Sequence, residues 1–122
     1  MGSIRLIVAS GFPALASLAN AAETHSTVPV EFRGDWADSG AECRRGALSE
    51  SRLTISENEI TFYASRGQIV AIATHDHSLA LIYEAAGEGY TWMDVRQFEL
   101  SSDQRTLTEV TGGRRGTVRI RC

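Results

Sequence analysis

The sequence predicts an all-β protein, a small antiparallel meander barrel of about eight strands closed by one disulfide. From Val30 onward, apolar residues alternate with polar ones at a period of two, which is typical of strands. Turn-forming residues interrupt this alternation about every ten positions. Such short connections favour antiparallel neighbours, and closure into a barrel removes the free edges. Cys43 and Cys122 lie near the two ends of the patterned region.

Residues 1–21 have the features of a cleavable signal peptide. Arg5 supplies the positive start, residues 6–18 are mainly apolar, and Ala19-Asn20-Ala21 matches the small-residue pattern at which signal peptidases cut. An apolar stretch of 13 residues is too short to cross a bilayer as an anchor. We therefore expect cleavage after Ala21, no transmembrane anchor, and a periplasmic or secreted protein.

The remaining chain is short enough for a single domain. Residues 22–29 are polar and without periodicity, which predicts a flexible leader before one domain over 30–122. Residues 22–122 carry 15 carboxylates against 11 arginines, a formal charge of −4, and contain no lysine. This composition excludes lysine-based covalent catalysis and disfavours nucleic acid as a partner.

Each expected strand is bounded by turn residues. Residues 59–65 show the pattern most clearly, because Ile60, Phe62 and Ala64 alternate with polar neighbours and Tyr63. A long polar loop over 37–48 carries Cys43. The expected strands cover residues 30–36, 51–56, 59–65, 68–74, 78–85, 90–100, 105–110 and 116–122. The expected turns lie at residues 57–58, 66–67, 75–77, 87–89, 102–104 and 112–113.

The strands 68–74 and 78–85 are apolar on both faces. A sheet face that meets water should alternate, so this pattern indicates that the pair is covered on both sides. The cover is the loop 37–48, which we favour, or a binding partner, or a second subunit in a homodimer through residues 68–85.

The longest strand, 90–100, carries two charges on its apolar side. Asp94 and Arg96 share the parity of Trp92 and Phe98. A β-bulge could shift the register in mid-strand, and this is the commoner arrangement. The alternative is that both charges point into the barrel, where unpaired burial is costly, and this would mark a functional interior.

The two cysteines are expected to form a disulfide, because an even number of cysteines in an exported chain favours one. A bond across 79 positions would stabilise the fold by at most about 4.5 kcal/mol in the chain-entropy model, because strain in the folded state subtracts from this figure. Two catalytic or metal-binding thiols are the alternative, but neither Cys43 nor Cys122 has a C-x-x-C partner.

His75-Asp76-His77 contains the one histidine pair in close spacing. His75 and His77 could bind a transition metal if a third ligand joined them, whereas in a hairpin turn the triplet is a polar connection, which we favour. The chain has no P-loop, G-x-G-x-x-G, nucleophile elbow or H-E-x-x-H motif. We expect a non-enzymatic protein without a cofactor.

Four arginines could form a partner-binding patch. Arg44 and Arg45 follow Cys43, and Arg114 and Arg115 precede the last strand. The disulfide would bring the two pairs together into a cationic surface for an acidic partner. Alternatively, the charges simply protect a solvated edge strand from aggregation.

The segment Phe32-Arg33-Gly34-Asp35-Trp36 is similar to the F-x-G-x-W opening of lipocalin-like barrels. This resemblance implies that Trp36, with Gly34 two residues before it, closes one end of the barrel. It also implies that an arginine of the last strand, Arg119 or Arg121, stacks on Trp36.

The wider pattern of these motifs, with Trp92 and a terminal cysteine, resembles uncharacterised small exported proteins of alphaproteobacteria. That resemblance implies a periplasmic location. Small envelope barrels of this size also include inhibitors of proteases and of lysozyme. The metalloprotease-inhibitor group shares the G-x-W start and a single disulfide, although its bridge closes a shorter loop.

The expected barrel is too small for a ligand cavity of lipocalin size, so side chains such as Phe62, Leu81, Trp92 and Ile120 should fill it. We therefore expect a protein-binding or envelope-interaction module with an envelope protein as its partner, including inhibition of a hydrolase such as a protease or lysozyme. A carrier of a small apolar ligand is the alternative, and a weak metal binder is the third.

Overall fold

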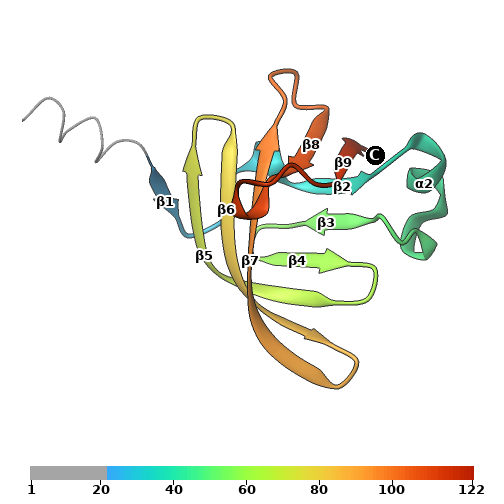
Figure 1. The fold of residues 1–122 in the computed structure, drawn as a ribbon, viewed down its shortest axis with the longest axis horizontal. Coiled ribbons are helices and arrows are strands. Elements are labelled where there is room, and N and C mark those ends of the chain that lie inside the picture. Colours follow the sequence, from blue (N-terminus) through green and yellow to red (C-terminus); the bar gives the residue numbers. More distant parts are fainter. Residues whose placement is uncertain (1–21) are drawn as a thin grey trace, which may run out of the picture.

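The computed structural model describes residues 22–122, so the predicted signal peptide over 1–21 lies outside the described residues. The described chain forms one antiparallel sheet that closes on itself (Figure 1). Its strands are β1 (Glu23–His25), β2 (Gly34–Ala37), β3 (Leu53–Ile55), β4 (Glu59–Phe62), β5 (Arg66–His75), β6 (Ser78–Gly87), β7 (Tyr90–Leu100), β8 (Thr106–Glu109) and β9 (Val118–Arg121). No helix in this part of the chain is both long and apolar enough to span a membrane.

Eight strands make the barrel, and the predicted all-β fold is confirmed. Strands β2 to β9 pair in sequence order, and the pairings of β2 with β9 and of β5 with β6 close the ring. The disulfide between Cys43 and Cys122 is also confirmed. The expected strand 90–100 coincides with β7, because its alternation is long and uninterrupted.

The region before β3 differs from the prediction in two places. Val30–Phe32 is a 3-10 helix, η1, rather than the start of a strand. The loop 37–48 contains the helix α2 (Gly40–Arg45), followed by a second 3-10 turn. Ser39 caps α2 by accepting a hydrogen bond from the backbone N–H of Glu42 at 3.1 Å. Ser39 and Glu42 have the spacing of a capping box, so the sequence did contain a signal for this helix.

The expected flexible leader over 22–29 is wrong, because this segment has an ordered place in the fold. Strand β1 pairs with residues Ile72–Thr74 of β5, outside the barrel. Strand β4 pairs only with the first residues of β5, up to Gln68, so β1 satisfies backbone groups further along β5 that would otherwise lack a partner. Val28 is fully buried in the core.

Apolar side chains form the core and fill one half of the barrel interior. Its largest buried side chains include Trp36, Phe32, Leu81 and Phe98. Two residues expected inside are not: Trp92 is 41% exposed, and Ile120 is 37% exposed. On β9 the inward positions belong to Arg119 and Arg121, which alternate with outward Val118 and Ile120. Trp92 lies on the part of β7 that extends beyond its pairing with β8.

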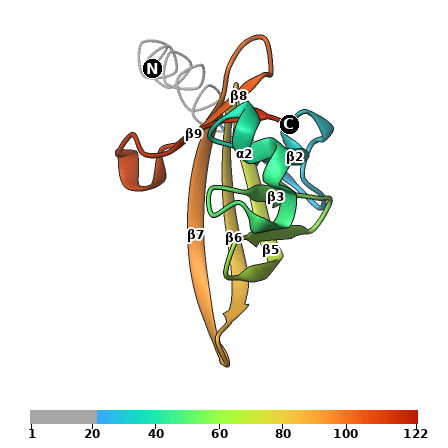
Figure 2. The same ribbon diagram turned by 90° about the vertical axis from the view of Figure 1, so that its right-hand side faces the viewer.

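The hairpin of β6 and β7 projects past the rest of the barrel (Figures 1 and 2). Its turn, Glu88-Gly89, has positive φ at both residues, 51° and 83°, as the tight turns that match strand twist require. Directly before this turn, a Cβ on Gly87 would lie 2.7 Å from the carbonyl oxygen of Ala64. Glycine at this position therefore lets the hairpin pack against the turn between β4 and β5.

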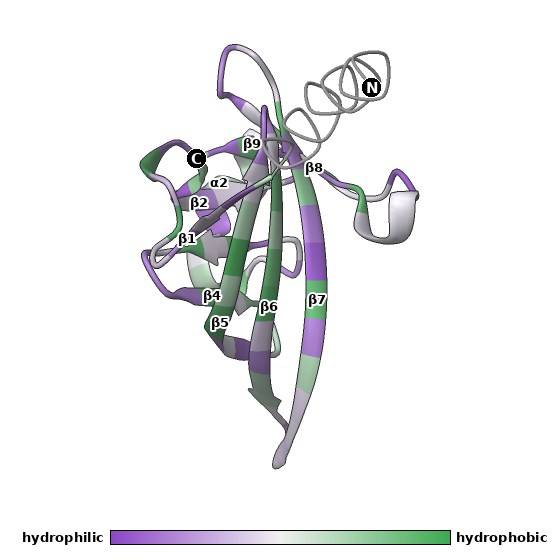
Figure 3. Ribbon diagram, turned by 90° about the vertical axis from the view of Figure 1, so that its left-hand side faces the viewer, coloured by the Kyte–Doolittle hydropathy of each residue, from purple (hydrophilic) through white to green (hydrophobic). Residues whose placement is uncertain are grey.

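The outer face of β5 and β6 is not covered by the loop 37–48, which corrects that expectation. The helix in this loop packs against β2 instead. Val70 is 61% exposed and Ile82 is 41% exposed on the outer side, where Figure 3 shows hydrophobic residues along β5 and β6. A bulge does occur in this sheet, but in β5 between Ile69 and Ala71.

Candidate functional site

One end of the barrel is closed by an arginine stacked on a tryptophan. The guanidinium carbon of Arg121 lies 4.2 Å from the centre of the Trp36 ring. Arg121 also donates hydrogen bonds to the carbonyl oxygens of Arg33 (2.8 Å) and Glu31 (2.7 Å). Gly34, at φ 130°, leaves room for this guanidinium, because a Cβ there would lie 3.2 Å from its Nη1. Arg121, rather than Arg119, takes the stacking position.

The four arginines expected to form one cationic patch lie on different parts of the surface. Arg44 and Arg45 belong to α2, whereas Arg114 and Arg115 follow the 3-10 turn η3 (Thr111–Gly113), which lies apart from α2 in Figures 1 and 2. The expectation of a shared patch is therefore wrong. The disulfide fixes only the end of β9, and the seven residues from 116 to 122 can span about 20 Å of extended chain.

The histidine pair lies at the turn between β5 and β6. His75 and His77 are both exposed, and the imidazole of His75 lies 3.5 Å from the carboxylate of Asp76. Within residues 22–122, no group of three or more His, Cys, Asp or Glu side chains is placed to hold a metal ion. The third ligand that a site at this turn requires is therefore missing among the described residues.

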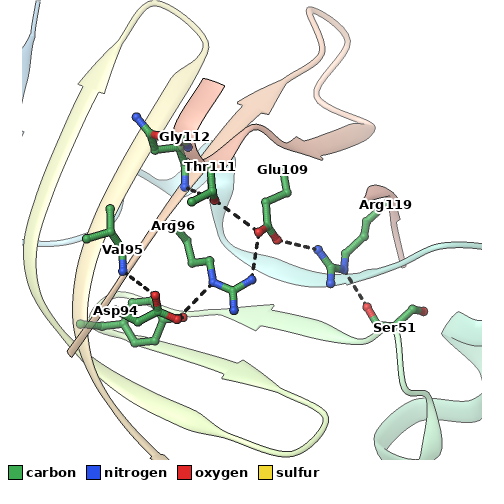
Figure 4. Close-up of polar contacts among 10 residues, drawn as sticks. Ser51, Asp94, Val95, Arg96, Glu109, Thr111, Gly112 and Arg119 are labelled. Carbon is green, nitrogen blue, oxygen red and sulfur yellow. Dashed lines mark hydrogen bonds and ion pairs between the residues drawn. The ribbon is translucent and has the colours of Figure 1, made fainter. Parts of the chain in front are cut away.

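The other half of the barrel interior holds an interior ionic chain, which we define as Asp94, Arg96, Glu109 and Arg119 (Figure 4). Strand β7 pairs with β6 without a register shift from Tyr90 to Glu99, so Asp94 and Arg96 both face inward. Of the two alternatives for this segment, the structure has the inward pair, and the bulge lies in β5.

Together with Tyr83, the chain links four strands through successive contacts. The hydroxyl of Tyr83 on β6 donates to Asp94 Oδ2 at 3.1 Å, and Arg96 Nε donates to the same oxygen at 3.4 Å. Arg96 Nη1 donates to Glu109 Oε2 on β8 at 2.9 Å. On β9, Arg119 Nη1 lies 3.7 Å from Glu109 Oε1.

Arg119 is the most buried member, with its side chain 8% exposed. Its Nε donates to the carbonyl oxygen of Ser51 at 2.7 Å, but its Nη1 hydrogen-bonds to no described residue. Phe62 lies against both guanidiniums, with Arg96 4.6 Å and Arg119 5.9 Å from the ring centre. These cation–π contacts offset part of the cost of burying the charges.

Burial and neighbouring charges shift three pKa values in this half of the barrel. Burial raises the pKa of Tyr83 to about 12, because the phenolate would lose its hydration. Burial also lowers the pKa of Arg119, although Glu109 opposes this effect. For Arg96, burial likewise disfavours the charged form, but the attraction of ionised Tyr83 and of Glu109 outweighs it and raises the pKa. The chain consists of two carboxylates and two guanidiniums, so its formal charges balance.

Beyond the ionic chain, the same face of β7 carries an aromatic ledge, which we define as Tyr90 and Trp92. Tyr90 is 73% exposed and Trp92 is 41% exposed, because β8 pairs with β7 only from Phe98 onward and leaves this part of the strand without a neighbour on that side. The side chains of Asp94 and Arg96 come next along the strand and are each about one-third exposed. The inner face of β7 therefore changes from exposed aromatic, through partly exposed ionic, to buried apolar.

The sequence contained part of this site. The shared parity of Asp94 and Arg96 indicated that both lie on one face. Glu109 and Arg119 were not predicted as their partners, because β8 and β9 reach β7 only through the closed sheet. The ledge was missed for a related reason: alternation shows which face a residue occupies, but not how far a strand extends beyond its neighbours.

Comparison with protein-family models, with curated proteins and with solved structures finds no match for this chain.

Proposed function

We propose that this protein is an exported protein-binding module that docks through the projecting β6–β7 hairpin, with the aromatic ledge as its anchor. The observation that carries the proposal is the exposure of Tyr90 and Trp92 on a hairpin that extends past the barrel. Exposed large aromatic side chains of this kind, with arginine beside them, dominate the binding energy of protein interfaces.

The structure around the ledge supports a role as a rigid anchor. Tyr83 donates to Asp94 across the two strands of the hairpin, and Arg96 donates to Glu109 on β8, which joins the hairpin to the rest of the barrel. A tight turn at Glu88-Gly89 and two long paired strands further restrict the hairpin. A pre-organised binding element loses less conformational entropy on association than a flexible loop does.

The charges beside the ledge indicate the chemistry of the partner. Glu84, Glu88 and Asp94 lie on the projecting half of the hairpin, and Arg66 lies across the sheet from Ala86. We therefore expect the partner to offer an apolar cleft with basic residues at its rim. A hairpin that enters such a cleft suits an envelope hydrolase, including a protease or lysozyme, as the target of inhibition.

Two further features support this proposal over transport of a small apolar ligand. Side chains such as Leu81 and Phe98 occupy the apolar half of the barrel interior, and the ionic chain crosses the other half. An apolar ligand inside would have to displace these paired charges, which is costly. The Cys43–Cys122 disulfide supports function in an oxidising compartment.

Affinity capture from an envelope extract, followed by native mass spectrometry, tests the proposal. The double variant Tyr90→Ser/Trp92→Ser should lose the stoichiometric protein partner that the unaltered protein retains. Tyr63→Ser is the matched control, because Tyr63 is also an exposed tyrosine, at 52%, but lies outside the hairpin. Equal recovery of the same partner by both variants would place the binding surface elsewhere. A small-molecule adduct without a protein would favour the carrier instead.

A further inference from the structure

The outward face of β5, β6 and β7 carries an outer patch, which we define as Val70, Ile82, Met93 and Val95. These side chains are between 41% and 61% exposed. They point away from the barrel, whereas the aromatic ledge lies on the inward-facing side of β7. Together with neighbouring alanines they form a continuous apolar area, and exposed apolar patches larger than a few hundred Å² mark interaction sites.

The strand register gives the layout of this face as five rungs, where a rung is a set of residues that pair side by side across β5, β6 and β7. The middle rung is Ala71, Ile82 and Val95, with the bulged Val70 beside it. The rungs on either side are Ala73, Ala80 and Gln97, and then Gln68, Glu84 and Met93. The end rungs are His75, Ser78 and Glu99, and Arg66, Ala86 and Thr91. The three middle rungs therefore contain a single charged side chain, Glu84.

We infer that the occupant of this face is a second copy of the same chain, in a two-fold symmetric dimer. At the centre of this face β6 is paired on both sides, with β5 and with β7, so it cannot add a further strand, and a second copy reaches it only by packing face to face. The face is sheet-like and apolar at its centre, which is the surface that face-to-face sheet packing buries. A two-fold axis at Ile82 places this side chain against its own counterpart.

The charges select the orientation of the two copies. If the two β6 strands ran in the same direction, each Glu84 would face the other Glu84 in an apolar interface, which is unfavourable. If they run in opposite directions, Glu84 faces the rung of Ala80. The end rung with the exposed Arg66 then overlies the end rung with the exposed Glu99 of the other copy. The opposite direction therefore matches apolar to apolar at the centre and cation to anion at the ends.

The interface is small, so the dimer should be weak and depend on concentration. A stable interface buries about 800 Å² on each partner, and this patch supplies less. Sedimentation equilibrium of the purified, disulfide-intact protein should therefore show the average mass rising from one copy toward two between about 10 µM and 1 mM. A one-copy mass throughout this range would overturn the inference.

Two isoleucines of similar exposure provide a matched test. Ile82→Glu should abolish the rise in mass, because it places two charges at the centre of the interface. Ile120→Glu should leave the rise unchanged, because Ile120 is 37% exposed on the outer face of β9, away from the patch. Circular dichroism spectra of both variants, compared with that of the unaltered protein, serve as the control for folding. A dimer that survives Ile82→Glu, or one that Ile120→Glu also removes, would contradict the proposed surface.

A charge exchange tests the orientation. Arg66→Glu and Glu99→Arg should each shift dimerisation to higher concentration, and the double variant should restore it. No recovery in the double variant would overturn the antiparallel arrangement. The inference is independent of the proposed function, because Tyr90→Ser/Trp92→Ser alters the opposite side of β7 and should leave the mass profile unchanged.

Discussion

Glu109 is the residue on which the interior ionic chain depends most, because it contacts both arginines. The substitution Glu109→Gln retains the shape of the side chain but removes its charge. Arg96 would lose a 2.9 Å charge-assisted hydrogen bond, and Arg119 would lose its nearest anion, at 3.7 Å. Removal of one partner from a buried ion pair typically costs 3–5 kcal/mol.

The expected loss lies at the lower end of that range, about 3 kcal/mol, because the Arg96 side chain is one-third exposed and can recover some hydration. For a domain of this size, such a loss lowers Tm by at least about 12 °C. Urea unfolding followed by circular dichroism, with the disulfide intact, measures the free energy of unfolding. A double variant, Glu109→Gln/Arg119→Met, should be less destabilised than the two single losses added together, because it removes both members of one pair.

Glu57→Gln is the matched control for this experiment. Glu57 also pairs with an arginine, Arg33, at 3.6 Å, but its side chain is 65% exposed. A surface pair of this kind contributes at most about 1 kcal/mol. A loss for Glu109→Gln as small as that for Glu57→Gln would refute the view that the barrel depends on this buried carboxylate.

Four further predictions follow from the same structure. The pKa of Tyr83 is raised from 10 to about 12 in the folded state, so its contribution to stability is fully present below pH 10 and lost as the pH rises to about 12. Alkaline unfolding should therefore be less pH-dependent in Tyr83→Phe. Reduction of Cys43–Cys122 should lower the free energy of unfolding by about 2–4 kcal/mol, seen as a lower urea midpoint in reductant. Gly67→Ala should cost about 1–3 kcal/mol in the same assay, because its Cβ would collide with the ring of Tyr83. Arg121→Ala should cost about 2–3 kcal/mol in thermal unfolding, since it removes the stacking on Trp36 and two hydrogen bonds that close the barrel end.

Long alternating strands were the part of the fold that could be predicted most accurately. The expected strand over 90–100 coincides with β7, and those over 68–74 and 78–85 lie within β5 and β6. Short elements before β3 were harder to predict, because two or three alternating residues are compatible with a 3-10 turn as well as with a strand. There the local cap at Ser39 and Glu42 was a better indicator than the period of apolar residues.

The partners of a charge are less predictable than the charge itself. The arginines 44–45 and 114–115 were expected to meet at the disulfide, yet that bond constrains only the residues beside it. Conversely, Glu109 meets both Arg96 and Arg119 although nothing in their spacing connects them. Proximity between distant segments is decided by strand order and register, which are properties of the whole sheet.

By itself, the sequence determined the strand alternation, the turn positions and the shared face of Asp94 and Arg96, since side-chain direction along a strand follows from local geometry. The cysteine count and spacing also predicted the disulfide. Only the tertiary structure decided that those two charges point inward, that Arg121 rather than Arg119 stacks on Trp36, and that the β6–β7 hairpin projects beyond the rim. These outcomes depend on which strands become neighbours and where each one ends, and both are set by packing of the closed barrel as a whole.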